Sequence, residues 1–199
     1  MNKQRFEAFS DGVFAFAATL LVLGFALPRA RYEHDAGLTT ALLHLWPNLV
    51  AYGLSFAVIG IMWQNHHALF RFVERIDRRT VFLNLLLLAA TAFIPFATST
   101  LGSYPTFKAA AFLYGLTLST SGGVYNLMIV RLVRNRAFSA GVGDTFIAGT
   151  VRAYRVGWVT YVIATIVALF WPVAAFAAYV AIVLYYLVPR GIDADIPSS

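Results

Sequence analysis

Six apolar stretches occupy most of this 199-residue chain, and they limit its fold more than any other feature. A helix needs roughly 20 mainly apolar residues to cross the hydrocarbon core of a bilayer. Charged residues make up 12% of the sequence, whereas a soluble domain usually has about a quarter. We therefore predict an all-α, multi-pass membrane protein with six transmembrane helices, at about residues 6–27, 45–70, 79–101, 107–130, 152–170 and 172–189.

The first and last spans need separate arguments. The N-terminal residues MNKQRFEAFSDG are basic, as in a signal peptide, but a full-length span follows without a small-residue cleavage site, so we expect a retained first helix. The last two spans are joined only at LFWPVAA, and their combined length exceeds one crossing, which favours a tight hairpin at Trp171–Pro172. We predict one transmembrane channel domain at 1–190 and a short polar tail at 191–199.

The distribution of basic residues predicts the orientation. Short cytoplasmic loops are enriched in Lys and Arg. With six spans, twelve of the fifteen basic residues fall on one side, so we predict that both termini are cytoplasmic. The net charge of +6 thereby indicates membrane topology, with the lipid bilayer rather than nucleic acid as the partner. The twelve residues are Lys3, Arg5, Arg71, Arg75, Arg78, Arg79, Arg131, Arg134, Arg136, Arg152, Arg155 and Arg190.

Polar residues recur at a similar depth in four of the spans, close to the predicted cytoplasmic side. Intramembrane polar groups are costly, so we expect them to interact with one another. Asp11 needs a partner, and a histidine from the second span, His66 or His67, is better placed than Arg5 on the same helix. Such a layer serves either to hold the helices together or to bind an ion or relay protons. Its members are Ser10, Asp11, Asn65, His66, His67, Asn84 and Asn126.

The chemistry available to this layer is limited. The chain has no cysteine, and no nucleophile beside a His/Asp pair has an evident orienting group, so we predict that the protein is not an enzyme. His66 and His67 are adjacent on a helix and point about 100° apart, which disfavours a shared metal site. We expect no metal and no organic cofactor.

Beyond Asp11, the first span carries a stripe at Phe16, Thr19, Leu20 and Leu23. This spacing places the four side chains on one helical face. Alone, such a stripe is typical of a packing or lipid-facing surface. Repeated around a symmetry axis, it would form a hydrophobic constriction, which can gate a channel by dewetting.

The same span carries RFEAFSDGVFA, which resembles the R-x-x-x-F-S-D signature of the transmembrane protein 175 family at Arg5, Phe9, Ser10 and Asp11. In the second span, IMWQNHHALF resembles that family's W-x-x-H-H segment at Trp63, His66 and His67. The resemblance covers the first hundred residues well, and from 101 onward it lies in hydropathy and loop charge alone.

The resemblance implies a six-helix protomer that assembles as a homotetramer around its first helices and conducts potassium ions without a carbonyl-lined filter. Matching positions imply apolar pore rings at Phe16, Leu20 and Leu23, a polar ring at Thr19, and a network of the Arg/Ser/Asp motif with the second-span histidine beneath them. Phe16 departs from the branched aliphatic residue usual at the innermost ring, so it bears on conductance and selectivity.

We predict a potassium-permeable cation channel of a bacterial inner membrane. The alternatives are a non-conducting structural or regulatory membrane protein, in which the polar layer serves packing alone, and a proton channel or proton-coupled transporter that uses Asp11 and the histidines as a relay.

Overall fold

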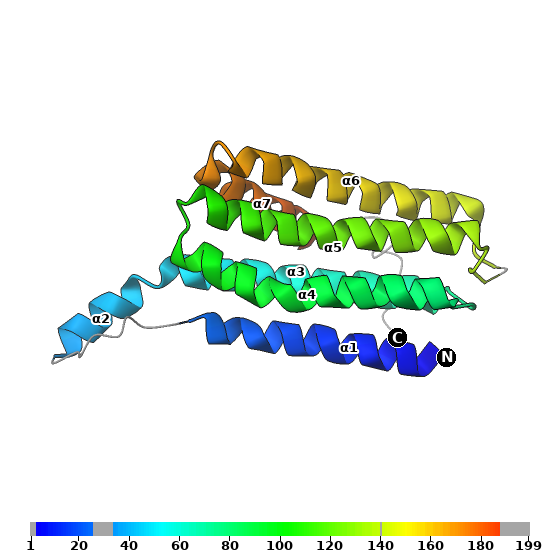
Figure 1. Cartoon of the computed structure of the whole chain (residues 1–199), viewed down its shortest axis with the longest axis horizontal. Coiled ribbons are helices and arrows are strands. Elements are labelled where there is room, and N and C mark those ends of the chain that lie inside the picture. Colours follow the sequence, from blue (N-terminus) through cyan, green and yellow to red (C-terminus); the bar gives the residue numbers. More distant parts are fainter. Residues whose placement is uncertain (1–2, 26–33, 140, 188–199) are drawn as a thin grey trace.

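The computed structural model describes residues 3–25, 34–139 and 141–187, and this part of the chain is helical, as predicted (Figure 1). The predicted tail, Arg190 and the last residues of the first and sixth spans lie outside the described residues. The helices are α1 (Lys3–Leu20), continued by the 3₁₀ turn η1 (Leu21–Gly24), α2 (Asp35–Leu43), α3 (Trp46–Arg71), α4 (Arg78–Ser103), α5 (Lys108–Arg134), α6 (Asp144–Ala168) and α7 (Pro172–Leu187).

The long helices lie side by side, with α1 at one edge of the bundle and α6 at the opposite edge (Figure 1). Between them, α4 packs on α5 and on α3, while α1 packs on α4 and α3. The shorter α7 packs against α6, α3 and α5. The chain reverses direction at Trp171–Pro172, which confirms the predicted hairpin: α6 ends at Ala168, and α7 begins at Pro172, where proline fits the first turn of a helix.

Two boundaries differ from the sequence-based prediction. The connection between the first two spans contains an additional helix, α2, none of whose residues is buried. Helix α6, which corresponds to the predicted fifth span, begins at Asp144, eight residues before that span. The helix continues beyond its apolar part as far as Gly143, whose backbone is extended. Apolar composition therefore marks a possible membrane crossing, whereas the helix itself extends into polar sequence.

Length and composition can be compared with a bilayer helix by helix. Among the described residues, three helices are both long and apolar enough to cross a membrane: Lys3–Gly24, α3 and α4. Helices α5 and α6 span 27 and 25 residues but carry more polar residues, and α7 is a shorter apolar helix.

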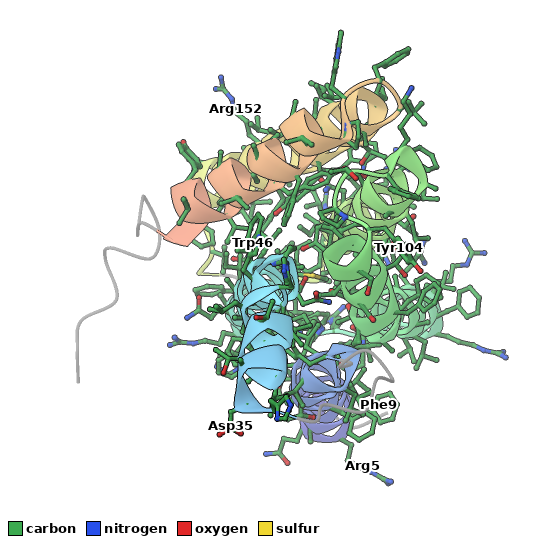
Figure 2. All side chains as sticks on the ribbon, turned by 90° about the vertical axis from the view of Figure 1, so that its left-hand side faces the viewer. Arg5, Phe9, Asp35, Trp46, Tyr104 and Arg152 are labelled. Atoms are coloured by element: carbon green, nitrogen blue, oxygen red, sulfur yellow. The ribbon has the colours of Figure 1, made fainter. Side chains whose placement is uncertain are left out.

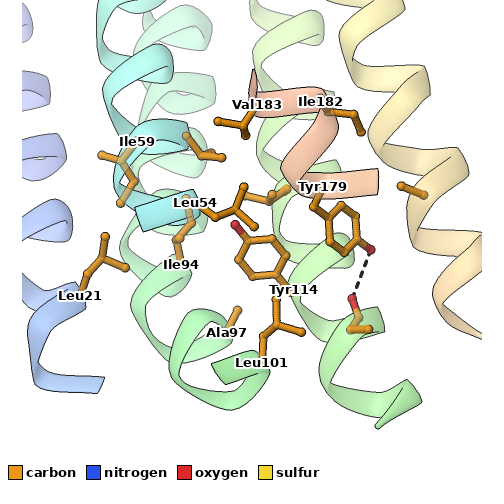
Figure 3. Packing of buried hydrophobic residues seen from close by; sticks show 14 of the residues in the cluster. Leu21, Leu54, Ile59, Ile94, Ala97, Leu101, Tyr114, Tyr179, Ile182 and Val183 are labelled. Atoms are coloured by element: carbon orange, nitrogen blue, oxygen red, sulfur yellow. Dashed lines mark hydrogen bonds between the residues drawn. The ribbon is translucent and has the colours of Figure 1, made fainter. Parts of the chain in front are cut away.

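The core consists of two clusters of buried apolar side chains. The larger one joins α1, α3, α4, α5, α6 and α7, and Figure 3 shows Tyr114 and Tyr179 at its centre. Tyr179 is fully buried and donates a hydrogen bond of 3.2 Å to the Ala111 carbonyl (Figure 3). A Cβ atom at Gly115 would overlap the Tyr179 hydroxyl, so this approach of α7 to α5 requires glycine. The smaller cluster surrounds Phe6, Phe70 and Met128 at the other end.

That other end, which we call the arginine-rich end, contains the start of α1, the loop 72–77 and the loop residues 135–139 and 141–143. Ser139 joins the two loops by donating its backbone N–H to the Phe72 carbonyl at 2.9 Å, and Arg131 of α5 contacts Asp77 of the first loop. Asp77 caps α4 by accepting from the Thr80 backbone N–H at 2.8 Å. Hydrogen bonds from the Arg131 guanidinium and the Thr80 hydroxyl hold the pKa of the Asp77 carboxyl well below its usual value.

Candidate pore helix and its polar network

Helix α1 has two distinct faces. One face is buried against α3 and α4, at Phe6, Ser10, Phe14 and Ala17. These residues recur every three or four positions, which is the spacing of one helical face. The opposite face carries large apolar side chains that are exposed in the described part of the protomer. Helix α1 thus contributes one side to this protomer and leaves the other available.

The exposed face contains the predicted stripe. Phe16 and Leu23 are 65% and 74% exposed, Thr19 is exposed, and Leu20 is partly buried. The Thr19 hydroxyl donates to the Phe16 carbonyl at 2.8 Å, so its hydrogen is used within the helix, while its oxygen remains on the exposed face.

Three buried side chains from three helices form what we call the polar network: Ser10, His66 and Asn84. The Asn84 amide donates to Ser10 Oγ at 2.9 Å, and its oxygen lies 2.9 Å from His66 Nε2. Ser10 in turn donates to the Phe6 carbonyl at 3.0 Å. Because the Asn84 oxygen can only accept, His66 is the donor in that pair and carries hydrogen on Nε2. The prediction that Ser10, His66 and Asn84 interact agrees with this geometry.

Aromatic rings enclose the histidine of this network. The rings of Phe14 and Phe70 lie 5.5 and 4.6 Å from the His66 ring, and Phe6 is stacked on it at 6.1 Å. His66 is 1% exposed. The network therefore lies in an apolar environment, where the amide of Asn84 determines which polar atoms can pair.

The prediction that His66 or His67 pairs with Asp11 is wrong. Its carboxylate accepts a hydrogen bond of 2.9 Å from the indole Nε1 of Trp63, and neither histidine bonds to it. His66 points toward Asn84 instead, and the His67 ring lies against Trp63 at 6.2 Å. The physical reason is helix geometry: Trp63 lies one turn before His66 and His67, and its long side chain reaches the exposed edge of α1, where Asp11 lies.

Two members of the predicted polar layer lie elsewhere. Asn126 donates to the Gly122 and Tyr154 carbonyls, so it connects α5 with α6. Asn65 contributes its backbone carbonyl to a 2.9 Å hydrogen bond from Tyr125. The layer is thus divided: one part joins α1, α3 and α4, and the other joins α3, α5 and α6.

Arg5 and Phe9, the remaining residues of the first-span motif, lie at the outer edge of the bundle and point away from it (Figure 2). Phe9 is 57% exposed. The motif therefore combines residues of both faces of α1: Ser10 inside the protomer, Arg5 and Phe9 outside it, and Asp11 between them. Within the described part of the chain, no group of three or more histidine and acidic side chains converges as a metal site would require.

A second set of buried hydroxyl groups, which was not predicted from the sequence, lies in the half of the bundle away from the arginine-rich end. Thr98 donates to Ser55 Oγ at 2.7 Å, and Ser55 Oγ lies 3.0 Å from the Tyr114 hydroxyl. Each residue lies on a different long helix, and all three are buried. Serine and threonine inside apolar helices gave no positional signal, because their hydroxyls can also bond to the backbone of the preceding turn.

Comparisons with known proteins agree with the motifs on α1 and α3. Residues 5–95 match the TMEM175 family, described as "Endosomal/lysosomal potassium channel TMEM175". A protein of Chamaesiphon minutus named "Potassium channel Cha6605_3372" is 38% identical over 160 residues, which cover 78% of this chain and 74% of that protein. The chain belongs to the TMEM175 family.

Other TMEM175 relatives and a solved structure extend this comparison. "Potassium channel B446_29190" of Streptomyces collinus is 51% identical over 105 residues, 52% of this chain and 50% of that protein. The human "Endosomal/lysosomal proton channel TMEM175" is 41% identical over 103 residues, 49% of this chain and 20% of that protein. The chain thus spans about half of the former relative and a fifth of the latter.

A crystal structure of a TMEM175 homolog from Chamaesiphon minutus superposes with a TM-score of 0.84 at 32% identity, covering 94% of this chain and 96% of the other. Its description names a lysosomal potassium-selective channel. The likeness includes α5, α6 and α7, which lie beyond the residues of the family match.

Proposed function

We propose that this protein is a potassium-permeable cation channel whose pore is formed by the α1 helices of several copies. The observation that carries this proposal is the exposed stripe of α1. Large apolar side chains on a helix at the edge of the bundle need either lipid or another protein surface, and the ring of copies that a channel requires supplies the latter. The names of the bacterial relatives support the choice of potassium.

The arrangement in the membrane follows the same reasoning. Six membrane-crossing helices, α1 and α3 to α7, would place the arginine-rich end in the cytoplasm by the positive-inside rule. Both chain ends would then be cytoplasmic, and residues 1–190 would form one channel domain in a bacterial inner membrane. We propose a homotetramer, in which the four copies of α1 surround the axis.

Each group of residues has a distinct role in this proposal. Phe16, Thr19, Leu20 and Leu23 line the narrow part of the pore. Ser10, His66 and Asn84 hold α1 against α3 and α4 from behind, and Trp63 fixes Asp11 at the edge of that contact. Arg5 and Phe9 lie on the outward side, where a neighbouring copy of α1 would meet them.

Proton permeation is the second candidate, and one observation favours it: the human relative is named a proton channel. The carboxylate of Asp11 lies at the exposed edge of α1 and bonds to Trp63, whose indole also contacts the His67 ring. A pore narrow enough to exclude hydrated potassium could still pass protons along a chain of water molecules. The width of the pore at Phe16 therefore determines whether potassium can pass as well as protons.

The test is Phe16→Ala in liposomes containing the purified protein. Because Phe16 is 65% exposed in the protomer, its truncation removes little of the protomer's own packing and should widen the pore, so we expect a severalfold increase in potassium flux. Ile163→Ala on α6, 56% exposed at the far edge of the bundle, is the control and should leave flux unchanged. Unchanged flux in Phe16→Ala would refute the assignment of the stripe to the pore.

A further inference from the structure

A cavity of about 490 Å³ lies between α3, α5 and α6, on the side of the bundle away from α1. Its volume lies within the range of small-molecule sites, roughly 300–1,000 Å³. It forms because α6 packs on α5 and α7, while α3 packs on α1, α4 and α7, so α3 and α6 diverge. Several lining residues, among them Gln64, Gly149 and Ala153, are exposed, which means that the cavity opens to the surface of the bundle.

The chemistry of the wall defines the class of ligand. Most of it is apolar, from Val58, Leu118, Ile129 and Phe146, and no charged side chain of the described residues lines it. An ionised head group would find no counter-charge there and would lose its hydration, which is unfavourable. A neutral molecule with a hydrocarbon body, arriving from the bilayer, fits these constraints.

Several polar side chains line the cavity, and two of them are amides with unused hydrogen-bonding groups. Asn65 and Gln64 both line it, and in the described part of the structure neither side chain forms a hydrogen bond. Amides at membrane depth gain from a partner that can both donate and accept, because lipid chains offer neither. A hydroxyl or neutral carbonyl on the ligand would satisfy them.

The same turn of α3 faces the pore helix on its other side. Residues 63 to 66 face two sides of α3. Trp63 bonds Asp11 and His66 bonds Asn84, whereas Gln64 and Asn65 line the cavity. If this turn of α3 rotates so that the Gln64 and Asn65 amides bond a ligand, the rotation also moves the Trp63 indole and the His66 imidazole, which hold α1. The cavity and the pore helix therefore share a rigid element.

We propose that this cavity binds a neutral single-chain amphiphile from the bilayer, with its hydroxyl or carbonyl head on Gln64 and Asn65, and that its occupancy shifts α1. Binding of the ligand does not require that the protein is a channel, whereas the effect on α1 and on potassium flux rests on the proposed function. Occupancy changes potassium flux through the contacts of α3 with α1.

The experiment uses a photoactivatable long-chain alcohol, with a diazirine in its chain, and the full-length protein in liposomes. The labelled residues are identified by mass spectrometry. We expect labelling at residues 146–158 of α6 and 58–69 of α3, and competition by hexadecanol but not by hexadecane or ionised palmitate. Asn65→Leu should weaken hexadecanol competition about fivefold, the effect of one net hydrogen bond.

A filling variant supplies the second measurement. At Gly149 on α6, an added Cβ would meet no atom within 4 Å, so Gly149→Leu can occupy the cavity without displacing backbone. We expect it to abolish labelling inside the cavity while retaining the elution volume and helical circular dichroism of the wild type. Val159→Leu, on the same helix but outside the cavity, should label as the wild type does.

Three results would overturn the proposal: equal labelling of Gly149→Leu and wild type, equal competition by alcohol and alkane, or labelling confined to the outer surface of α6. Flux is measured in parallel with and without hexadecanol. Labelling with unchanged flux would refute the coupling to α1, and absent potassium flux with intact labelling would refute the channel and leave the binding site established.

Discussion

Replacing Asn84 with leucine should destabilise the protein more than any other single exchange of a polar residue in its network. Asn84 is 2% exposed and bonds both Ser10 Oγ and His66 Nε2 at 2.9 Å. Hydrogen bonds between membrane helices contribute on average about 0.6 kcal/mol each, so two give about 1 kcal/mol. His66 is also left buried without a partner, which costs a further ~1–3 kcal/mol. Ser10 keeps its bond to the Phe6 carbonyl and adds little.

The expected loss is therefore about 2–4 kcal/mol in the free energy of unfolding, taken from the two hydrogen bonds and the unpaired imidazole. It can be measured by SDS titration of the purified protein in mixed micelles, followed by circular dichroism. Asn126→Leu is the matched control: its amide bonds two backbone carbonyls and leaves no side chain unpaired, so we expect ~1 kcal/mol or less.

A double variant separates the two contributions. In Asn84→Leu with His66→Phe, the unpaired imidazole is gone, so the double variant should cost less than the sum of the two single variants. Strict additivity, or a loss in Asn84→Leu no larger than in Asn126→Leu, would refute the view that the amide pairs the two buried groups.

Two further predictions concern the edge of α1 and the arginine-rich end. Trp63→Phe removes the donor to Asp11 and should lower the free energy of unfolding by about 0.5–1.5 kcal/mol, the net contribution of one hydrogen bond, and a second exchange, Asp11→Asn, should recover part of that loss in the same titration. Asp77→Asn keeps an oxygen to cap α4 but removes the pair with Arg131; because the side chain is 39% exposed, we expect a loss below about 1 kcal/mol at pH 7. The folded-state pKa of Asp77 is lowered, so this contribution is present above the unfolded-state pKa and declines as the pH falls from about 4 toward the folded-state pKa; the difference in thermal unfolding between the wild type and Asp77→Asn should therefore be smaller at pH 3 than at pH 7.

Much of the fold follows from apolar length and charge. The long helices, the reversal at Trp171–Pro172 and the clustering of arginines at one end were all predictable, because burial in lipid requires about 20 apolar residues and loops interrupt them. Helix α2 was not, since nine residues with little periodicity give no signal distinct from a loop. The early start of α6 was missed for a related reason: hydropathy detects the lipid-exposed part of a helix, whereas hydrogen bonding sets its ends.

Three of the seven residues of the predicted polar layer form the polar network, and the expected pairing of Asp11 with a histidine is wrong. Depth along each helix could be counted from the sequence, so Ser10, His66 and Asn84 were placed together. Rotation about each helix axis could not be counted as well, because neighbouring residues differ by about 100° and a partner's angle depends on packing. For that reason Trp63, not a histidine, meets Asp11, and Asn126 lies on the opposite side of the bundle.

The position of α1 at the edge of the bundle has a consequence for synthesis. The ribosome makes this helix before α3 and α4: the amide that bonds Ser10 follows 74 residues later, and the indole that bonds Asp11 follows 52 residues later. Until α3 and α4 have been inserted, a carboxylate and a serine have no partner from another helix. The contacts that hold α1 to the bundle can therefore form only after α3 and α4 have been made.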